Sequence, residues 1–184
     1  MGATLQQDRC TQNDYVRLFA DSAESLEWLC YTLTGDKALS EKVLGSALEQ
    51  SLKGADRVFR DWMVSWARRL IIQACIRLIR PTGQGMEECV CLHQKREEAI
   101  SDLLELALSQ PSDVLQQRLL NLDPLLRFVF VLRALEGYSR RDTALLLEIG
   151  DRTCESMYIS ALEAVQPRLY VLNPDTPVTE LVAI

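Results

Sequence analysis

The sequence contains one histidine, His93, and lacks the patterns through which most enzymes do their chemistry. It has no glycine-rich loop of the kind that binds phosphate and no serine in the sharp turn typical of hydrolases. A single histidine leaves few groups that could act as a base near neutral pH. We therefore expect that the protein is not an enzyme and has no cofactor.

Long apolar runs are also missing. No segment approaches 18 uncharged apolar residues, so no membrane span is expected. The start, MGATLQQDRC, has no basic stretch followed by an apolar run, so we expect no secretory signal. The six cysteines are scattered through helical sequence, which fits reduced, buried thiols better than a disulfide framework. These features favour a cytoplasmic protein.

One short cluster has the residue types of a metal site. Cys89, Cys91 and His93 alternate over five residues. Zinc needs four ligands, usually with two residues between cysteines, and the fourth would have to come from a distant residue such as Cys75. We interpret the cluster as ordinary linker sequence and expect no metal.

The chain does have enough apolar residues to form buried cores. It has 184 residues, 48% of them hydrophobic, which suits one medium domain or two small ones. The net charge of −6 argues against a protein that coats nucleic acid without specificity, but it permits a local basic face.

Three helices are predicted in the N-terminal half. Apolar residues recur every three, four or seven positions over residues 13–33, which predicts one helix. Gly35-Asp36 interrupts this pattern, and the aspartate can cap a second helix that runs to about Leu52. Asp56 can cap a long third helix, which Pro81 ends.

This third helix is strongly basic. Positions 57–80 hold six arginines and one acidic residue, a local charge of +5. Trp62 and Trp66, one turn apart, could stack on unpaired bases. The alternative is that both tryptophans lie in the core and the arginines pair with acids of neighbouring helices. The face expected to be buried comprises Met63, Ala67, Leu70, Ala74 and Leu78. The residues that could contact nucleic acid are Arg68, Arg69, Gln73, Arg77 and Arg80.

The C-terminal half predicts a pair of short helices joined by a tight turn. A helix is expected over 92–108, a break over 109–113, and then further helices up to Gly137. Ser139 with Asp142 forms a capping-box pattern that starts a short helix. A turn at 148–150 leads to a second helix from about Arg152, which completes a helix-turn-helix. The last residues, from 173 to 184, have no periodicity and predict a flexible tail.

In a helix-turn-helix that binds DNA, early residues of the second helix touch base edges. The candidates are Arg152, Thr153, Ser156 and Tyr158, with Arg140 and Arg141 on the helix before. Glu155 would face phosphate with the wrong charge, and Met157 and Ser160 stand where a basic residue would help. Over 122–172 there are seven acidic and six basic residues, so the module is near neutral. A bundle that serves packing or protein contact is an equal alternative.

Taken together, the chain resembles a bacterial RNA polymerase sigma factor of the extracytoplasmic-function group, as a divergent member. Three segments of the N-terminal half carry the likeness: Gly35-Asp36 with Ser40 to Leu44, Phe59 to Met63, and Ala67 to Leu70 with Ile76-Arg77. In the C-terminal half it rests on Leu132, Arg133, Glu136 to Ser139, Ala144, Thr153, Ser156 and Ala161. The resemblance covers about residues 14–80 and 122–169.

The resemblance implies an all-α fold of two small helical domains. It places a region-two-like domain at 1–81, a partly helical linker at 82–112, a region-four-like domain at 113–172 and the tail at 173–184. It implies that the second helix docks on core RNA polymerase through Glu41, Val43, Leu44 and Glu49. It further implies that the arginine helix meets the −10 promoter element and the helix-turn-helix reads the −35 element. An anti-sigma factor is a further expected partner.

The sequence departs from the family pattern at several of these sites. The docking helix has Lys42, Gly45 and Ser46 where relatives carry an acid, a glutamine and an acid. The loop before the third helix is shorter than is usual in the family. Glu148 occupies the position in the turn where the family pattern has glycine. Two functions follow from the resemblance: a sigma factor that binds polymerase and promoter DNA, or a divergent sigma-like protein that has lost promoter binding and regulates through protein contacts. A helical interaction module unrelated to transcription is a third reading.

Overall fold

The computed structural model describes residues 9–80 and 97–166, and within these ranges every regular element is helical. The predicted all-α class is therefore confirmed. The N-terminal half contains α1 (Gln12–Asp21), α2 (Ala23–Thr34), α3 (Lys37–Lys53) and α4 (Met63–Ile79). Two short 3₁₀ turns, η1 (Ala55–Arg57) and η2 (Arg60–Trp62), connect α3 to α4. Cys89, Cys91, His93 and the predicted tail lie outside the described residues.

The C-terminal half begins, within the described part, with α5 (Glu97–Leu108) and α6 (Ser112–Leu120). α7 (Pro124–Phe130) runs directly into a π-helical segment, η3 (Val131–Leu135). α8 (Arg140–Leu147) and α9 (Asp151–Ala164) form the predicted helix-turn-helix. α5 falls within the predicted linker, yet it packs on α9, and Gln166 Nε2 donates a hydrogen bond of 2.9 Å to the Leu103 carbonyl.

Two helix starts were correctly predicted from capping residues. The Leu39 amide donates to Asp36 Oδ1 at 2.8 Å, and the Asp142 amide donates to Ser139 Oγ at 3.1 Å. Gly35 ends α2 in the left-handed conformation, with φ of 69°. These local interactions need no tertiary partner, which is why sequence reasoning finds them.

Two predicted helices differ from the structure. The single helix expected over 13–33 is divided at Ser22 into α1 and α2. The helix expected from Asp56 begins only at Met63, because Val58 and Phe59 are extended and the Cys10 amide donates to the Val58 carbonyl at 2.9 Å. The N-terminal half therefore has four α-helices where three were expected. Leu78, expected to face the core, is 43% exposed.

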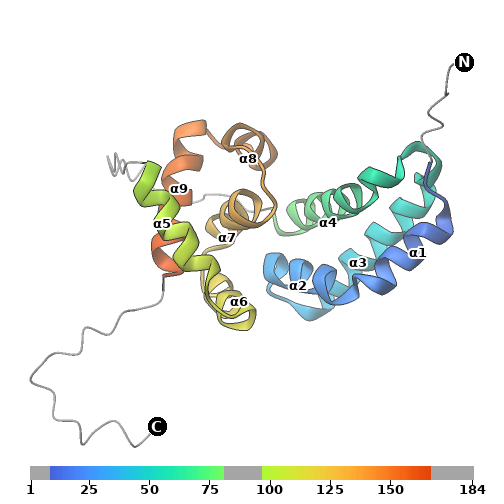
Figure 1. Ribbon diagram of the computed structural model, residues 1–184, viewed down its shortest axis with the longest axis horizontal. Coiled ribbons are helices and arrows are strands. Elements are labelled where there is room, and N and C mark those ends of the chain that lie inside the picture. Colours follow the sequence, from blue (N-terminus) through green and yellow to red (C-terminus); the bar gives the residue numbers. More distant parts are fainter. Residues whose placement is uncertain (1–8, 81–96, 167–184) are drawn as a thin grey trace, which may run out of the picture.

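The N-terminal and C-terminal halves pack against each other. Figure 1 shows α2 and α4 ending beside α6 and α7, with α8 and α9 beyond them. One hydrophobic cluster takes residues from both halves, including Leu33 of α2 and Phe128 of α7. A second, smaller cluster around Tyr15 and Ala67 belongs to the N-terminal half alone. We call the contact between the halves the seam. No helix in the described part of the chain is long and apolar enough to span a bilayer.

Candidate functional site

The outer face of α4 carries exposed aromatic and basic side chains. Trp62 is 69% exposed and Trp66 is 39% exposed, so the alternative that placed both in the core is wrong. They lie four positions apart, Trp62 at the N-cap of α4 and Trp66 in its first turn, away from the buried face of Ala67, Ile71 and Ala74. We call this surface the α4 stripe. It comprises Trp62, Trp66, Arg69, Gln73, Arg77 and Arg80, of which all but the half-buried Gln73 are exposed.

Arg68 differs from its neighbours on the α4 stripe because an acid of the other half holds it. Its Nε donates to Glu136 Oε2 at 2.9 Å, and its Nη2 forms a second, close contact with Glu136 Oε1. Arg68 Nη1 also donates to Ser25 Oγ at 3.2 Å. Hydrogen bonding to Glu136 raises the pKa of Arg68 above its usual value. The predicted contact between Arg68 and DNA is therefore unavailable while this pair is formed.

A polar cleft of about 510 Å³ opens beside this ion pair. Residues of α4 line one wall, and residues around the start of α8 line the other. Arg69 reaches into the cleft near Tyr138, whose pKa is raised chiefly by burial. The cleft brings the α4 stripe next to the helix-turn-helix, a proximity that no sequence pattern predicted.

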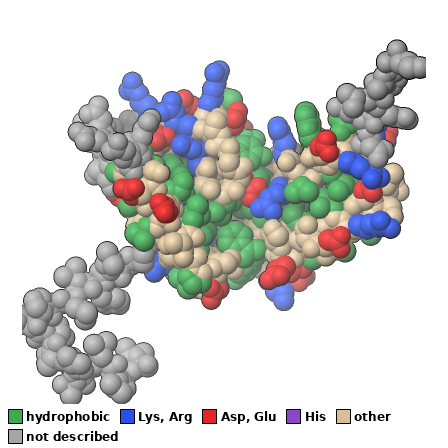
Figure 2. Space-filling model, in the orientation of Figure 1, with side chains coloured by type: hydrophobic (Ala, Val, Ile, Leu, Met, Phe, Trp, Pro, Cys, Tyr) green, Lys and Arg blue, Asp and Glu red, His purple; other side chains and the backbone are tan. Residues whose placement is uncertain are grey.

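In the helix-turn-helix, three arginines gather near the first turns of both helices. Arg140 and Arg141 begin α8, Arg152 lies in the first turn of α9, and all three are exposed. Arg140 forms an ion pair of 3.5 Å with Asp151, so the two helix starts lie side by side. Figure 2 shows basic side chains projecting from the part of the surface over α8 and α9. Helix N-termini and arginines together favour an anion such as phosphate.

The rest of α9 is far less accessible than a DNA-reading helix requires. It packs against α5, α7 and α8. Tyr158 is only 4% exposed, and Met157 is equally buried. Tyr158 therefore cannot reach a base in this conformation. Thr153 and Ser156 are half-buried, so Arg152 is the most accessible of the residues predicted to read DNA from this helix.

Arg133 of η3 holds α9 in place. Its guanidinium lies 4.4 Å from the centre of the Tyr158 ring, and its Nη1 donates to Glu155 Oε2 at 3.0 Å. Glu155, at a position where the resemblance to sigma factors implies a basic residue, is thus paired within the protein. The pairing partly neutralises the negative charge of Glu155. It does not give α9 a positive side chain that could contact a DNA phosphate.

The residues predicted to dock on polymerase do not share one surface. Val43 is fully buried in the core and cannot contact a partner in this conformation. Glu49 is exposed and pairs with Lys53 at 2.6 Å, and that hydrogen bond lowers the pKa of Glu49. Glu41 and Leu44 line a groove of about 570 Å³ on α2 and α3. The groove also contains Glu24, Glu27, Trp28, Tyr31, Lys37, Ser40 and Gln116.

Comparison with known families adds a match in the C-terminal half. Residues 112–164, from the start of α6 to the end of α9, match the family model for sigma-70, region 4. This segment is similar to region 4 of sigma-70 proteins. The match covers under a third of the chain and includes the helix-turn-helix with its arginines. No curated protein matches the chain.

The similarity to region 4 agrees with the helix-turn-helix geometry described above. Region 4 belongs to proteins of transcription initiation and is not itself an enzyme, so the chain is sigma-factor-like in this segment. The α4 stripe and the groove on α2 and α3 lie outside the matched residues. Their assignment rests on their own geometry and on the sequence resemblance of the N-terminal half.

Proposed function

We propose that the protein is a sigma-factor-like protein of transcription initiation that binds core RNA polymerase and promoter DNA. The observation that carries this proposal is the match of residues 112–164 to region 4, joined to an N-terminal half that exposes a basic, aromatic helix. The function is recognition and strand opening driven by binding, without catalysis or a cofactor. We assign it to the extracytoplasmic-function group, as a divergent cytoplasmic member that an anti-sigma factor could control.

Within this proposal each surface has one task. The α4 stripe contacts the −10 element, with Trp62 and Trp66 stacking on unpaired bases and Arg69 and Arg77 facing phosphates. Arg140, Arg141 and Arg152 contact the phosphates of the −35 element. The groove that Glu41 and Leu44 line takes a segment of polymerase. The domain bounds that accompany this reading are 1–81 and 113–172.

The α4 stripe is tested by removing two of its arginines. In complex with core polymerase, Arg69→Ala with Arg77→Ala should weaken binding to a forked promoter DNA. It should also make the plot of log affinity against log salt shallower by about 1 to 2, since each phosphate contact contributes about 0.7 to 0.9. Arg17→Ala with Arg57→Ala is the control, because it removes the same charge from exposed sites off the stripe. Equal slopes for the two double variants would show that the α4 stripe does not contact DNA phosphates.

The second candidate function is a sigma-like regulator that no longer reads promoters. Two observations favour it: α9 presents few cations, and Arg68 is paired with Glu136. Capture of core polymerase by the full chain, followed by a promoter-opening assay on the complex, separates the two functions. Opening supports the first. Capture without opening supports the second.

A further inference from the structure

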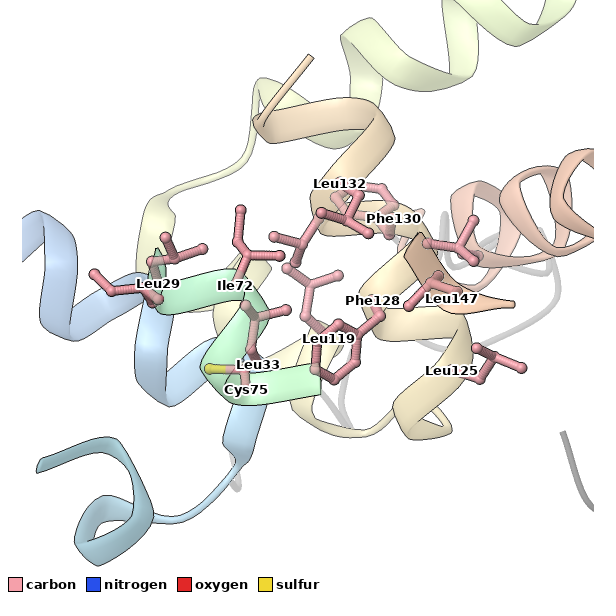
Figure 3. Packing of buried hydrophobic residues seen from close by; sticks show 14 of the residues in the cluster. Leu29, Leu33, Ile72, Cys75, Leu119, Leu125, Phe128, Phe130, Leu132 and Leu147 are labelled. Atoms are coloured by element: carbon pink, nitrogen blue, oxygen red, sulfur yellow. The ribbon is translucent and has the colours of Figure 1, made fainter. Parts of the chain in front are cut away.

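The start of α4, which carries Trp62, lies at the end of the N-terminal half that points away from the seam (Figure 1). Farther along, α4 is fixed in the cluster shared by both halves, to which it contributes Ile72 (Figure 3). The start of α4 packs instead on the smaller cluster. Residues 54–62 connect α3 to this end through two short 3₁₀ turns. The position of Trp62 therefore depends on what holds this connection in place.

A short N-terminal segment, residues 9–11, is paired with the connection, and we call it the N-terminal strap. The Cys10 amide donates to the Val58 carbonyl at 2.9 Å, and both side chains are buried in the smaller cluster. Arg9 faces Phe59 in an isolated antiparallel bridge. Because side chains alternate along paired extended segments, Arg9 and Phe59 share the opposite, outer face.

The side chain of Arg9 fastens the connection at two points. Its Nη1 donates to the carbonyl of Asp56 in η1 at 2.8 Å, and its guanidinium lies 5.4 Å from the centre of the Phe59 ring. The Phe59 carbonyl in turn accepts a hydrogen bond of 3.0 Å from the amide of Trp62 in η2. A continuous set of contacts thus runs from Arg9 through Phe59 to Trp62.

The carboxylate of Asp14 in α1 joins the N-terminal strap to η2. Thr11, the last residue of the strap, caps α1, and its amide donates to Asp14 Oδ2 at 2.8 Å. The same oxygen accepts from Arg60 Nη2 of η2 at 3.3 Å. The strap therefore has a fixed direction where it crosses the connection, and η2 is fastened beside it.

We propose that the N-terminal strap is a positioning element of the surface that binds unpaired bases: Arg9 holds residues 54–62 so that Trp62 is placed to stack on a base. Arg9 acts through Phe59 rather than by touching DNA. Because the connection is ordered beforehand, DNA binding loses less conformational entropy than if it had to order these residues. The inference rests on the proposed function for its DNA ligand, whereas the positioning of Trp62 rests on contacts within the chain.

Amide hydrogen exchange in the full chain tests whether Arg9 holds the connection. Arg9→Ala should speed exchange of the Trp62 amide, which donates to the Phe59 carbonyl, by about tenfold. The Arg80 amide, bonded to the Ile76 carbonyl at the other end of α4, is the internal control and should not change. Arg9→Lys keeps a cation and a donor of similar reach, so its exchange should stay near that of the wild type. Unchanged exchange at Trp62 in Arg9→Ala would overturn the proposal.

The salt dependence of DNA binding distinguishes positioning from direct contact. In complex with core polymerase, Arg9→Ala should bind forked promoter DNA about tenfold more weakly, with the slope of log affinity against log salt unchanged. A slope shallower by about 0.7 to 0.9 would overturn the proposal, because Arg9 would then contact a phosphate. Arg17→Ala removes the same side chain from an exposed site on α1 and is the control, with affinity expected near that of the wild type.

A double-mutant cycle shows whether Arg9 acts through Trp62. Trp62→Ala should weaken binding to forked DNA, and adding Arg9→Ala to it should cost less than about twofold more. A further loss of about tenfold would overturn the proposal, since Arg9 would then act independently of Trp62. If the wild-type complex binds no forked DNA while the exchange results hold, the positioning of Trp62 by the strap stands and the proposed function fails.

Discussion

At the scale of single residues, the turn of the helix-turn-helix shows a local conflict. Glu148 ends α8 in the left-handed region, with φ of 56° and ψ of 38°, at the position where the resemblance to sigma factors implies glycine. A side chain with a Cβ atom is strained in this region by about 1 to 2 kcal/mol. The turn forms nevertheless, because Ile149 packs against the core and its amide donates to the Ala144 carbonyl at 3.0 Å. Tertiary packing thus overrides the local preference.

Replacing Glu148 with glycine should relieve this strain. We expect Glu148→Gly to raise the free energy of unfolding by about 0.5 to 1 kcal/mol, since glycine adopts positive φ readily but adds freedom to the unfolded chain. Urea unfolding followed by circular dichroism measures the change. Glu105→Gly, inside α5, is the matched control and should cost about 1 kcal/mol. A loss of stability in both proteins would show that Glu148 is not strained.

At the scale of the element, α9 is the helix whose sequence and surroundings disagree most with a DNA reader. Three positions at which the resemblance to sigma factors implies basic residues have different surroundings here. Met157 is buried in the core, Glu155 pairs with Arg133, and Ser160 faces solvent. A basic side chain could reach DNA only from positions 155 and 160. The weakness of α9 as a reader therefore comes from both composition and packing.

Restoring cations at the two accessible positions should restore electrostatic binding. In the full chain, Glu155→Lys with Ser160→Arg should steepen the salt dependence of duplex binding by about 2, since each added phosphate contact contributes about 0.9. The variant loses the Arg133 pair, so its helical content is checked first. Glu105→Lys in α5 with Ser109→Arg just after it makes the same charge change away from α9 residues. Equal slopes for the two variants would show that α9 does not lie against DNA.

At the scale of the whole molecule, the larger core is shared by both halves. Its members run from Leu26 in α2 to Val165 beyond α9, and the smaller cluster around Tyr15 is confined to the N-terminal half. A change in the shared core should therefore affect how the halves meet, whereas a change in the smaller cluster should affect one half.

Leu33→Ala tests this difference because Leu33 is fully buried in the shared core. Removing its side chain should lower the free energy of unfolding by about 2 to 5 kcal/mol. It should also let the halves separate at a lower urea concentration, measured as the midpoint of energy transfer between dyes attached at the exposed positions 42 in α3 and 145 in α8. Leu18 packs against the smaller cluster. Leu18→Ala should therefore lower the urea midpoint of helical circular dichroism, but the midpoint of energy transfer should not fall below it. The same response in both proteins would contradict separate cores.

Features that depend on short stretches of chain were predictable. The caps at Asp36 and Ser139, the left-handed end at Gly35 and the turn at 148–150 follow from neighbouring residues. The division at Ser22 was missed because apolar spacing continues across it and its side chain makes no capping bond. The arginine stripe was predicted as a surface, but its tryptophans could not be placed, since an aromatic residue suits core and surface alike.

By itself, the sequence determined the all-helical class, the helix-turn-helix and the basic face of α4, because periodicity, capping and local charge act over a few residues. Only the tertiary structure decided that Arg68 pairs with Glu136, that Val43 and Tyr158 are buried, and that the two halves share a core. The physical reason is distance along the chain. Arg68 and Glu136 are 68 residues apart, and their contact exists only because apolar helix faces from both halves are driven together out of water.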